Sequence, residues 1–175
     1  WAPEVPGVQS LAFDGERVFL GGGFNEANGV FRPRLVVVDT TSGGLDLGFD
    51  AGICHNTGNV NRLAFNGQYL FALGCANPCG QSCRALSVLD PYTGARIPDM
   101  EQFFNTRVRD MQLSADGLTL YLGGSFDEVQ DPVNGFLDRH HLAAIDTITG
   151  LFTEWAPEPM REVFDLELHG GRLFV

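Results

Sequence analysis

Four cysteines are the residues whose type and spacing most clearly suggest chemistry. They are Cys54, Cys75, Cys79 and Cys83. An even, clustered set of this kind is typical of a disulfide framework formed in an oxidising compartment. A zinc site that uses the same thiolates with His55 is the alternative, although the spacing lacks the paired C-x-x-C arrangement of structural zinc sites. The sequence therefore favours disulfides, and we predict no metal site.

Titratable side chains form a second set of candidates. His140 and His141 follow Asp138, a combination that could bind a metal or transfer protons, or serve only as the entry to a strand. The surrounding carboxylates could offer oxygen ligands to Ca²⁺, but they lack the ordered D-x-[DN]-x-[DN]-G spacing of a calcium loop. These carboxylates are Asp127, Glu128, Asp131 and Asp138. The sequence contains no nucleophile elbow, phosphate loop or zinc-protease motif, so we predict no catalytic residue and no cofactor.

The charge of the chain limits its partners. Twenty-two acidic residues face eleven arginines and no lysine, which gives a net charge of −11. An acidic surface repels phosphate, so nucleic acid and anionic membranes are poor partners, and we predict no nucleic-acid partner. No apolar run reaches the roughly 18–20 residues that span a bilayer. With 44% hydrophobic and 19% charged residues, the chain is expected to fold around a core.

The elements that must position these residues come from an internal repeat of about 50 residues. Similar segments begin at Val8, Val60, Val108 and Val163. In each copy, two apolar runs are joined by a pair such as Asp14-Gly15, which suits a tight hairpin turn. Downstream, a D-x-x-[ST]-G turn recurs at Asp39–Gly43, Asp90–Gly94 and Asp146–Gly150. Each repeat is therefore predicted to be four antiparallel strands.

Several predicted strands are apolar on both faces, which indicates that each sheet is covered on both sides by its neighbours. Four-stranded repeats of this length predict an all-β fold, namely a segment of a β-propeller, and fit a β-helix less well. The predicted parts are a blade end (1–7), three blades (8–59, 60–107 and 108–162) and a partial blade (163–175). Because propellers have four to eight blades, we expect a longer polypeptide; a small fragment that self-associates is the alternative.

Several short motifs lie along the chain: Gly21-Gly22 and Gly123-Gly124, the following Phe24 and Phe126, R-x-R-L from Arg32, the D-x-x-[ST]-G turns, and W-x-P from Trp155. This set resembles the delta-60 repeat propellers, a bacterial family of unknown function, and its Gly-Gly element is similar to that of kelch blades. The second repeat departs most, with Leu73-Gly74 in place of Gly-Gly and a cysteine-rich loop. The resemblance implies a secreted or surface propeller and supplies no catalytic residues.

In such a blade, the longer connections and the links between blades share one side of the molecule, and diverse loops on a fixed scaffold are where binding usually occurs. The cysteines fall on this side. Of three possible connectivities we favour Cys75 with Cys83 and Cys54 with Cys79, and the other two stay open. The acidic segment 125–140 falls on the same side.

The first strand of each repeat should line a central channel. Its polar positions (Ser10, Arg62, Asp110 and Asp165) would face the axis. Arg62 and Asp110 could pair there, so a ligand site of Arg62, Asp110 and Asp165 at the channel mouth is one interpretation, and a solvated structural channel is the other. His140 and His141 complete the candidate ligand-binding residues.

The sequence thus predicts a non-enzymatic extracellular or cell-surface module, a scaffold or a binder of protein or glycan through its long-connection side. The alternative is an enzyme at the channel mouth, such as a polysaccharide hydrolase or lyase, which needs titratable groups that converge on one pocket. A lectin with one site per repeat is less favoured, because the loops do not repeat.

Overall fold

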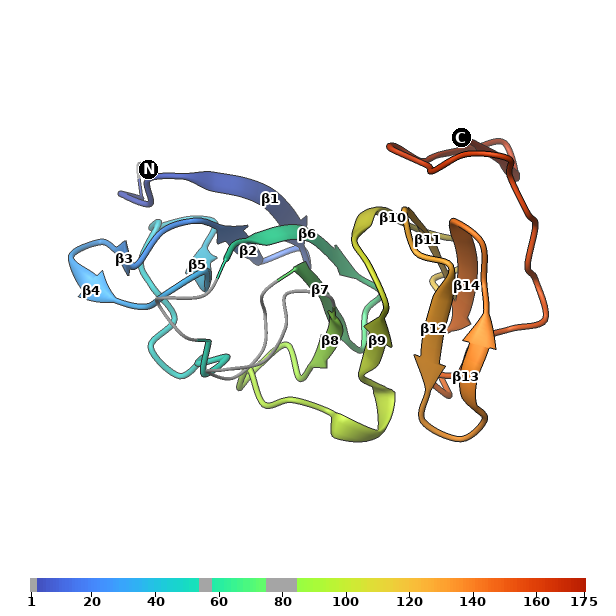
Figure 1. Ribbon diagram of the computed structural model, residues 1–175. Helices are drawn as coiled ribbons and strands as arrows, with labels where there is room; N and C mark the ends of the chain where they lie inside the picture. Colours follow the sequence, from blue (N-terminus) through green and yellow to red (C-terminus); the bar gives the residue numbers. More distant parts are fainter. Residues whose placement is uncertain (1–2, 54–57, 75–84) are drawn as a thin grey trace. The chain divides into compact units, whose positions relative to one another are not determined.

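The computed structural model describes residues 3–53, 58–74 and 85–175. Throughout these residues the regular structure is β-strand, apart from one turn of 3₁₀ helix, η1 (Pro98–Met100). The prediction of an all-β fold is confirmed (Figure 1). The chain divides into two compact units, residues 1–97 and 98–175.

The first unit contains two three-stranded antiparallel meanders and one small hairpin (Figure 1). The hairpin lies within the connection between the second and third strands of the first meander. The first meander is β1 (Val8–Phe13), β2 (Arg17–Gly22) and β5 (Leu35–Asp39), the hairpin is β3 (Glu26–Ala27) with β4 (Val30–Phe31), and the second meander is β6 (Val60–Phe65), β7 (Leu70–Gly74) and β8 (Ala85–Leu89).

The second unit repeats this plan and adds strands from its long connection. Its meander is β10 (Val108–Leu113), β11 (Thr119–Gly124) and β14 (Leu142–Asp146). The long connection forms β12 (Glu128–Asp131) and β13 (Gly135–Asp138), and β12 also pairs with β9 (Gln102–Phe104). A final hairpin consists of β15 (Glu167–His169) and β16 (Arg172–Phe174).

The three meanders share the same register irregularity. In each, a β-bulge interrupts the pairing of the first two strands two residues after the strand begins, between Val8 and Ser10, between Val60 and Arg62, and between Val108 and Asp110. A bulge leaves one extra residue unpaired and re-aims the neighbouring side chains. The sequence repeat therefore corresponds to a structural repeat.

In the first and third repeats, the predicted fourth strand is reduced to a single bridge in the described residues. These bridges join Val38 to Leu45 and Ile145 to Phe152, and a bridge in the second repeat joins Leu89 to Arg96. In the first and third repeats the ladder stops because the next N–H group is taken: Gly48 N–H donates to Asp46 Oδ1, and Trp155 N–H donates to Thr153 Oγ1. The four-stranded description needs this correction in these two repeats.

Each D-x-x-[ST]-G turn is closed by its own aspartate. Asp146 Oδ1 accepts hydrogen bonds from the N–H groups of Ile148 (3.0 Å) and Thr149 (2.8 Å) and from Thr149 Oγ1 (3.0 Å). Asp39 and Asp90 accept equivalent bonds in their turns. Gly43, Gly94 and Gly150 then take positive φ, as the turn requires. The turn chemistry predicted from sequence is confirmed.

These hydrogen bonds make the turns sensitive to acid. The bond from Thr149 N–H is the main reason that the pKa of Asp146 lies below its ordinary value, and the pKa values of Asp39 and Asp90 are lowered in the same way. A carboxylate with a lowered folded-state pKa contributes stability above its unfolded pKa, about 3.9, and loses it as pH falls through the folded value. We expect Asp146→Asn to be less stable than the wild type at neutral pH, and we expect the difference to shrink as pH falls through the folded pKa of Asp146. Urea unfolding at neutral and acid pH measures this, and a difference independent of pH would contradict it.

The core of the first unit lies between its two meanders. Phe19, Leu35 and Val37 on one sheet pack against Leu63 and Leu70 on the other. Alternate residues of the first sheet, Leu20, Val36 and Val38, belong to a second buried cluster on its opposite face. Because β2 and β5 bury side chains on both faces, these strands read as continuous apolar runs in the sequence.

The contact between one repeat and the next takes the same form in both units. A Cβ added to Gly21 would lie 2.7 Å from Val60 Cγ1 and 3.1 Å from Leu63 Cδ1, and Gly123 is covered in the same way by Val163 and Leu166. A polar side chain also ties each pair of repeats together. Ser10 Oγ accepts the Leu63 N–H (2.8 Å), and Asp110 Oδ2 accepts the Leu166 N–H (2.9 Å).

Candidate functional site

The long connection of the third repeat carries the most distinctive exposed surface among the described residues. It forms the β12–β13 hairpin, which extends from β9 as a three-stranded antiparallel run, β9-β12-β13. Residues 132–134 form the tip of the hairpin, and Gly135, the first residue of β13, has a φ of +75°. A three-residue loop with a glycine of positive φ beside it is a common connection between antiparallel strands, so the local sequence directs this fold.

The two faces of this run differ in burial. Phe104 and Val129 pair across β9 and β12 on one face, and both are buried. The opposite face carries Phe103, Gln130 and Phe136, which we call the aromatic row. Gln130 pairs with Phe103 on one side and with Phe136 on the other, so the three side chains lie next to one another.

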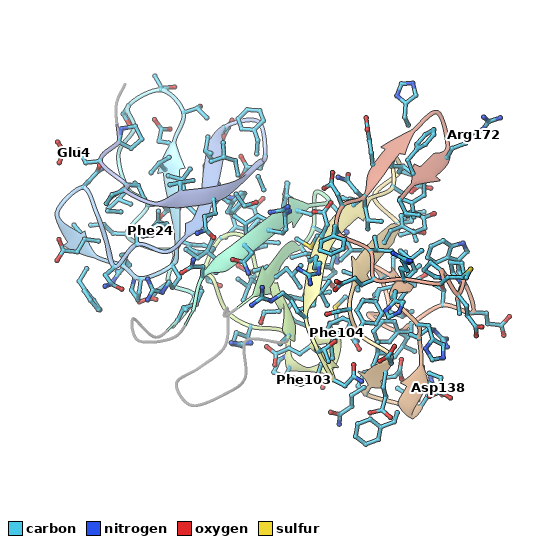
Figure 2. All side chains as sticks on the ribbon, turned by 45° about the horizontal axis from the view of Figure 1, so that its top comes forward. Glu4, Phe24, Phe103, Phe104, Asp138 and Arg172 are labelled. Carbon is cyan, nitrogen blue, oxygen red and sulfur yellow. The ribbon has the colours of Figure 1, made fainter. Side chains whose placement is uncertain are left out.

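The aromatic row is open to solvent. Phe136 is 69% exposed, Gln130 is exposed and Phe103 is half-buried. The outer two residues are two strands apart, which separates their Cα atoms by about 10 Å. Figure 2 labels Phe103 and Phe104 on β9 and Asp138 on the outer strand of the hairpin. Two neighbouring aromatic rings open to solvent on a sheet face make this face a candidate binding surface.

Polar groups surround the row. A groove of about 170 Å³ is lined by the aromatic row together with Asn105 and Glu128. Glu128 lies on the same face as Gln130, two residues before it, and pairs in register with Asp138. This face thus combines two aromatic rings, an amide that can donate and accept, and two carboxylates.

Asn105 fixes the start of the hairpin. Its Oδ1 atom accepts the N–H groups of Asp127 (3.1 Å) and Glu128 (3.3 Å), while the Asn105 N–H donates to the Glu128 carbonyl (3.1 Å). The segment that carries Phe103 is therefore joined to the base of the hairpin by hydrogen bonds of both the side chain and the backbone N–H of Asn105. Strand β9 itself is anchored on the third repeat, because buried Gln102 donates through Nε2 to the Gly150 carbonyl.

Asp131 anchors the other end of the hairpin. Its Oδ1 accepts the N–H groups of Val133 (2.9 Å) and Asn134 (2.7 Å), and its Oδ2 accepts the Phe152 N–H (3.2 Å). Burial raises the pKa of Asp131, but the hydrogen bonds from Asn134, Val133 and Phe152 outweigh burial and hold it below its ordinary value. Asp131 is 2% exposed and lies on the face opposite Glu128, so the acidic residues of this connection do not form one ligand set.

The two histidines share one acidic neighbour. His140 Nδ1 lies 3.5 Å from Asp127 Oδ1, and His141 Nδ1 lies 3.8 Å from the same atom. His141 has a positive φ (+66°). Its N–H donates to the Phe126 carbonyl and its carbonyl accepts the Gly124 N–H, so it holds the two ends of the long connection together. Arg34 has the same conformation and bonds in the first repeat, and it is buried. This position therefore closes the loop and is not a simple solvent-facing strand entry.

The three channel-mouth candidates differ in their surroundings. Asp110 is buried (3% exposed) and accepts the Leu166 N–H, as described above. Arg62 is half-buried and donates to the carbonyl of its neighbour Asn61 (3.1 Å), and Asp165 is exposed. The Asp110 carboxylate is thus used in a structural hydrogen bond, and the ligand role of the set stays a prediction.

The cysteines for which disulfides were predicted are not among the residues that the structure describes. Cys54, Cys75, Cys79 and Cys83 lie in segments 54–57 and 75–84, which are not among the described residues, so the disulfides and the zinc alternative stay predictions. Within residues 3–53, 58–74 and 85–175, no group of three or more His, Asp or Glu side chains could hold a metal ion. A second hollow, of about 510 Å³, is lined in the first unit by Glu4, Glu26 and Gly29.

Comparison with known proteins finds structures with a similar fold but assigns the chain to no family. No protein-family model and no curated protein matches this chain. Among solved structures, it is similar to the computationally designed Ika4 protein, with a TM-score of 0.61, 15% identity, and coverage of 95% of this chain and 82% of that chain. The designed Ika8 protein is similar too, with a TM-score of 0.60, 15% identity, and coverage of 95% of this chain and 41% of that chain.

These likenesses show that the arrangement of strands is shared with designed proteins, and they indicate no ligand. The described part of the chain also has no helix long and apolar enough to cross a membrane.

Proposed function

We propose that this chain is part of an extracellular or cell-surface β-propeller, similar to the delta-60 repeat proteins, that binds a glycan through the long-connection side of its third repeat. Three equivalent meanders and two repeat-to-repeat contacts of identical form support a propeller built by stacking. The clustered cysteines support an oxidising compartment.

The aromatic row is the single observation on which the binding function rests. Aromatic faces stack on the C–H faces of sugar rings, while amide and carboxylate groups bind hydroxyls. Phe103 and Phe136 are two strands apart, a spacing that suits every second sugar of a linear glycan, and Gln130 lies between them. Aromatic platforms also stack nucleic-acid bases, but Glu128 and a net charge of −11 repel phosphate. A neutral glycan fits this combination.

The enzyme alternative has less support. An active site needs two or more titratable groups directed at one pocket. The buried carboxylate of Asp110 is used in a backbone hydrogen bond, and the buried carboxylate of Asp131 holds a turn. A non-enzymatic binding role therefore remains our proposal.

The test replaces the aromatic row. We expect the chain to bind neutral polysaccharides on a glycan array, and we expect Phe136→Ala and Phe103→Ala each to weaken that binding by about tenfold or more, because each removes a stacking face. Isothermal titration with the best glycan measures the change. Ile148→Ala is the matched control, since Ile148 is similarly exposed (64%) on the Asp146 turn.

Two outcomes would contradict the proposal. One is binding that is unchanged in both phenylalanine variants. The other is a chain that binds no glycan but captures a protein through the same face, which would favour a protein ligand.

A further inference from the structure

We infer, on the basis of the proposed function, that the aromatic row takes an extended, uncharged glycan with β-1,4 links. This glycan lies across β9, β12 and β13, and Glu128 is the residue that determines its specificity. The class of glycan follows from the spacing of the two rings, and the preference for an uncharged glycan follows from the polar side chains beside them.

Two rows of side chains cross the three strands next to each other on this face. The first is the aromatic row. The second, which we call the polar row, consists of Asn105, Glu128 and Asp138. Glu128 pairs in register with Asp138, and the Asn105 N–H donates to the Glu128 carbonyl (3.1 Å). Each member of the polar row is two residues along the chain from a member of the aromatic row, so the two rows run about 7 Å apart.

The aromatic row determines which glycan conformation fits. Phe103 and Phe136 lie on one face, two strands and so about 10 Å apart, with Gln130 between them. In an extended β-1,4-linked glycan each sugar is turned over relative to the next, so every second sugar presents the same ring face, at about this repeat length. A coiled α-1,4-linked glycan curves away from such a row. Both rings therefore stack on sugars only when the glycan is extended and lies along the row.

A glycan in this position has one edge over the polar row. Carboxylates accept hydrogen bonds and donate none, so they bind the hydroxyls of that edge, through bonds stronger than those between neutral groups. They repel an edge that carries carboxylate or sulfate groups. Glu128 is half-buried on the middle strand and lines the groove, whereas Asp138 is exposed on the outer strand. Glu128 is therefore the stronger determinant of specificity.

The pairing of Glu128 with Asp138 opposes folding. Like charges directly opposite each other on neighbouring strands destabilise a sheet. Within the part of the chain that the structure describes, neither carboxylate forms an ion pair that would offset this repulsion. A pair that costs stability on the face of the aromatic row is explained by binding, which uses both carboxylates as acceptors.

The experiment titrates the 175-residue chain with defined hexasaccharides in a calorimeter. The probes are the β-1,4-linked hexasaccharides of glucose, mannose and N-acetylglucosamine, their uronate counterparts with carboxylates in place of the C6 alcohols, and the α-1,4-linked hexasaccharide of glucose. We expect one of the neutral β-1,4-linked probes to bind about tenfold or more tightly than both its uronate counterpart and the α-1,4-linked probe. Raising NaCl from about 0.05 M to about 0.5 M should narrow only the first difference, because only that difference is electrostatic.

Glu128→Gln tests the specificity determinant. We expect it to weaken binding of the neutral probe by about fivefold, because it loses the charge-assisted hydrogen bonds. The preference over the uronate counterpart should fall to about twofold. Its free energy of unfolding should be unchanged or higher, because the like-charge pair is removed. Glu158→Gln is the matched control, since it removes the same charge from an exposed position of the same unit outside the polar row, and it should bind like the wild type.

The outcomes separate this inference from the proposed function. If Phe103→Ala and Phe136→Ala lose binding, two results would overturn the inference alone. One is an α-1,4-linked probe that binds as tightly as the best β-1,4-linked probe, and the other is Glu128→Gln with the affinity and preference of the wild type. A chain that binds no glycan, or phenylalanine variants that bind like the wild type, would overturn the proposed function and the inference with it.

Discussion

Gly124→Ala is expected to destabilise the second unit by about 3 kcal/mol, at the upper end for overpacking a tight site. The reason is the β-bulge between Val108 and Asp110, which brings β10 against Gly124. A Cβ at Gly124 would overlap the Arg107 carbonyl oxygen and lie 2.9 Å from Val108 Cα. Both obstacles are backbone atoms that no side-chain rotation can move. Gly22→Ala should have an equal effect in the first unit, where the Gly7 carbonyl lies at the same position.

Urea unfolding followed by Trp155 fluorescence, in a Trp1→Phe background, measures this loss for the unit that holds Trp155. Gly135→Ala is the matched control because Gly135 has a positive φ but no atom within 4 Å of an added Cβ. Its expected cost is only the left-handed conformation, about 1 kcal/mol. If Gly124→Ala proves no more costly than Gly135→Ala, the bulge is not what requires glycine.

Local patterns explain why much of the fold could be predicted. The Asp-Gly pairs, the D-x-x-[ST]-G turns and the doubly apolar runs act over a few residues, and the structure has the corresponding hairpins, turns and strands. The fourth strand could not be predicted in this way. Its pairing ends where Asp46 and Thr153 side chains bind nearby N–H groups, a competition between local and ladder bonds that apolar patterning does not reveal.

The candidate site was predictable only in outline. The sequence placed binding on the long-connection side, of which the segment 125–140 is one part, and Asn134-Gly135 was the available signal for a hairpin in that segment. The aromatic row was missed because Phe103 joins Phe136 through pairing between β9 and β12, whose register depends on long-range contacts. Alternation within β9 distinguishes Phe103 from its buried neighbour Phe104 only once this pairing is known.

Asp131→Ala is expected to destabilise the second unit by about 3 kcal/mol, since the buried N–H of Phe152 and the turn N–H groups lose a charged acceptor. Asp131→Asn retains one acceptor oxygen and should cost about 1 kcal/mol. Because its hydrogen bonds keep the Asp131 pKa low, the stabilising effect of the carboxylate is present above about pH 4 and fades as pH falls through the folded pKa. The difference between wild type and Asp131→Asn should therefore shrink in acid.

The control variant Asp138→Ala separates the anchoring role of Asp131 from the general effect of removing a negative charge. Asp138 is on the same hairpin but exposed, so its replacement should change the free energy of unfolding by about 0.5 kcal/mol or less. Urea unfolding of the three variants gives the order directly. Equal losses in Asp131→Ala and Asp138→Ala would contradict the anchoring role. With that role intact, Asp131→Ala should also weaken glycan binding without touching the ligand, because the turn that it holds positions Phe136.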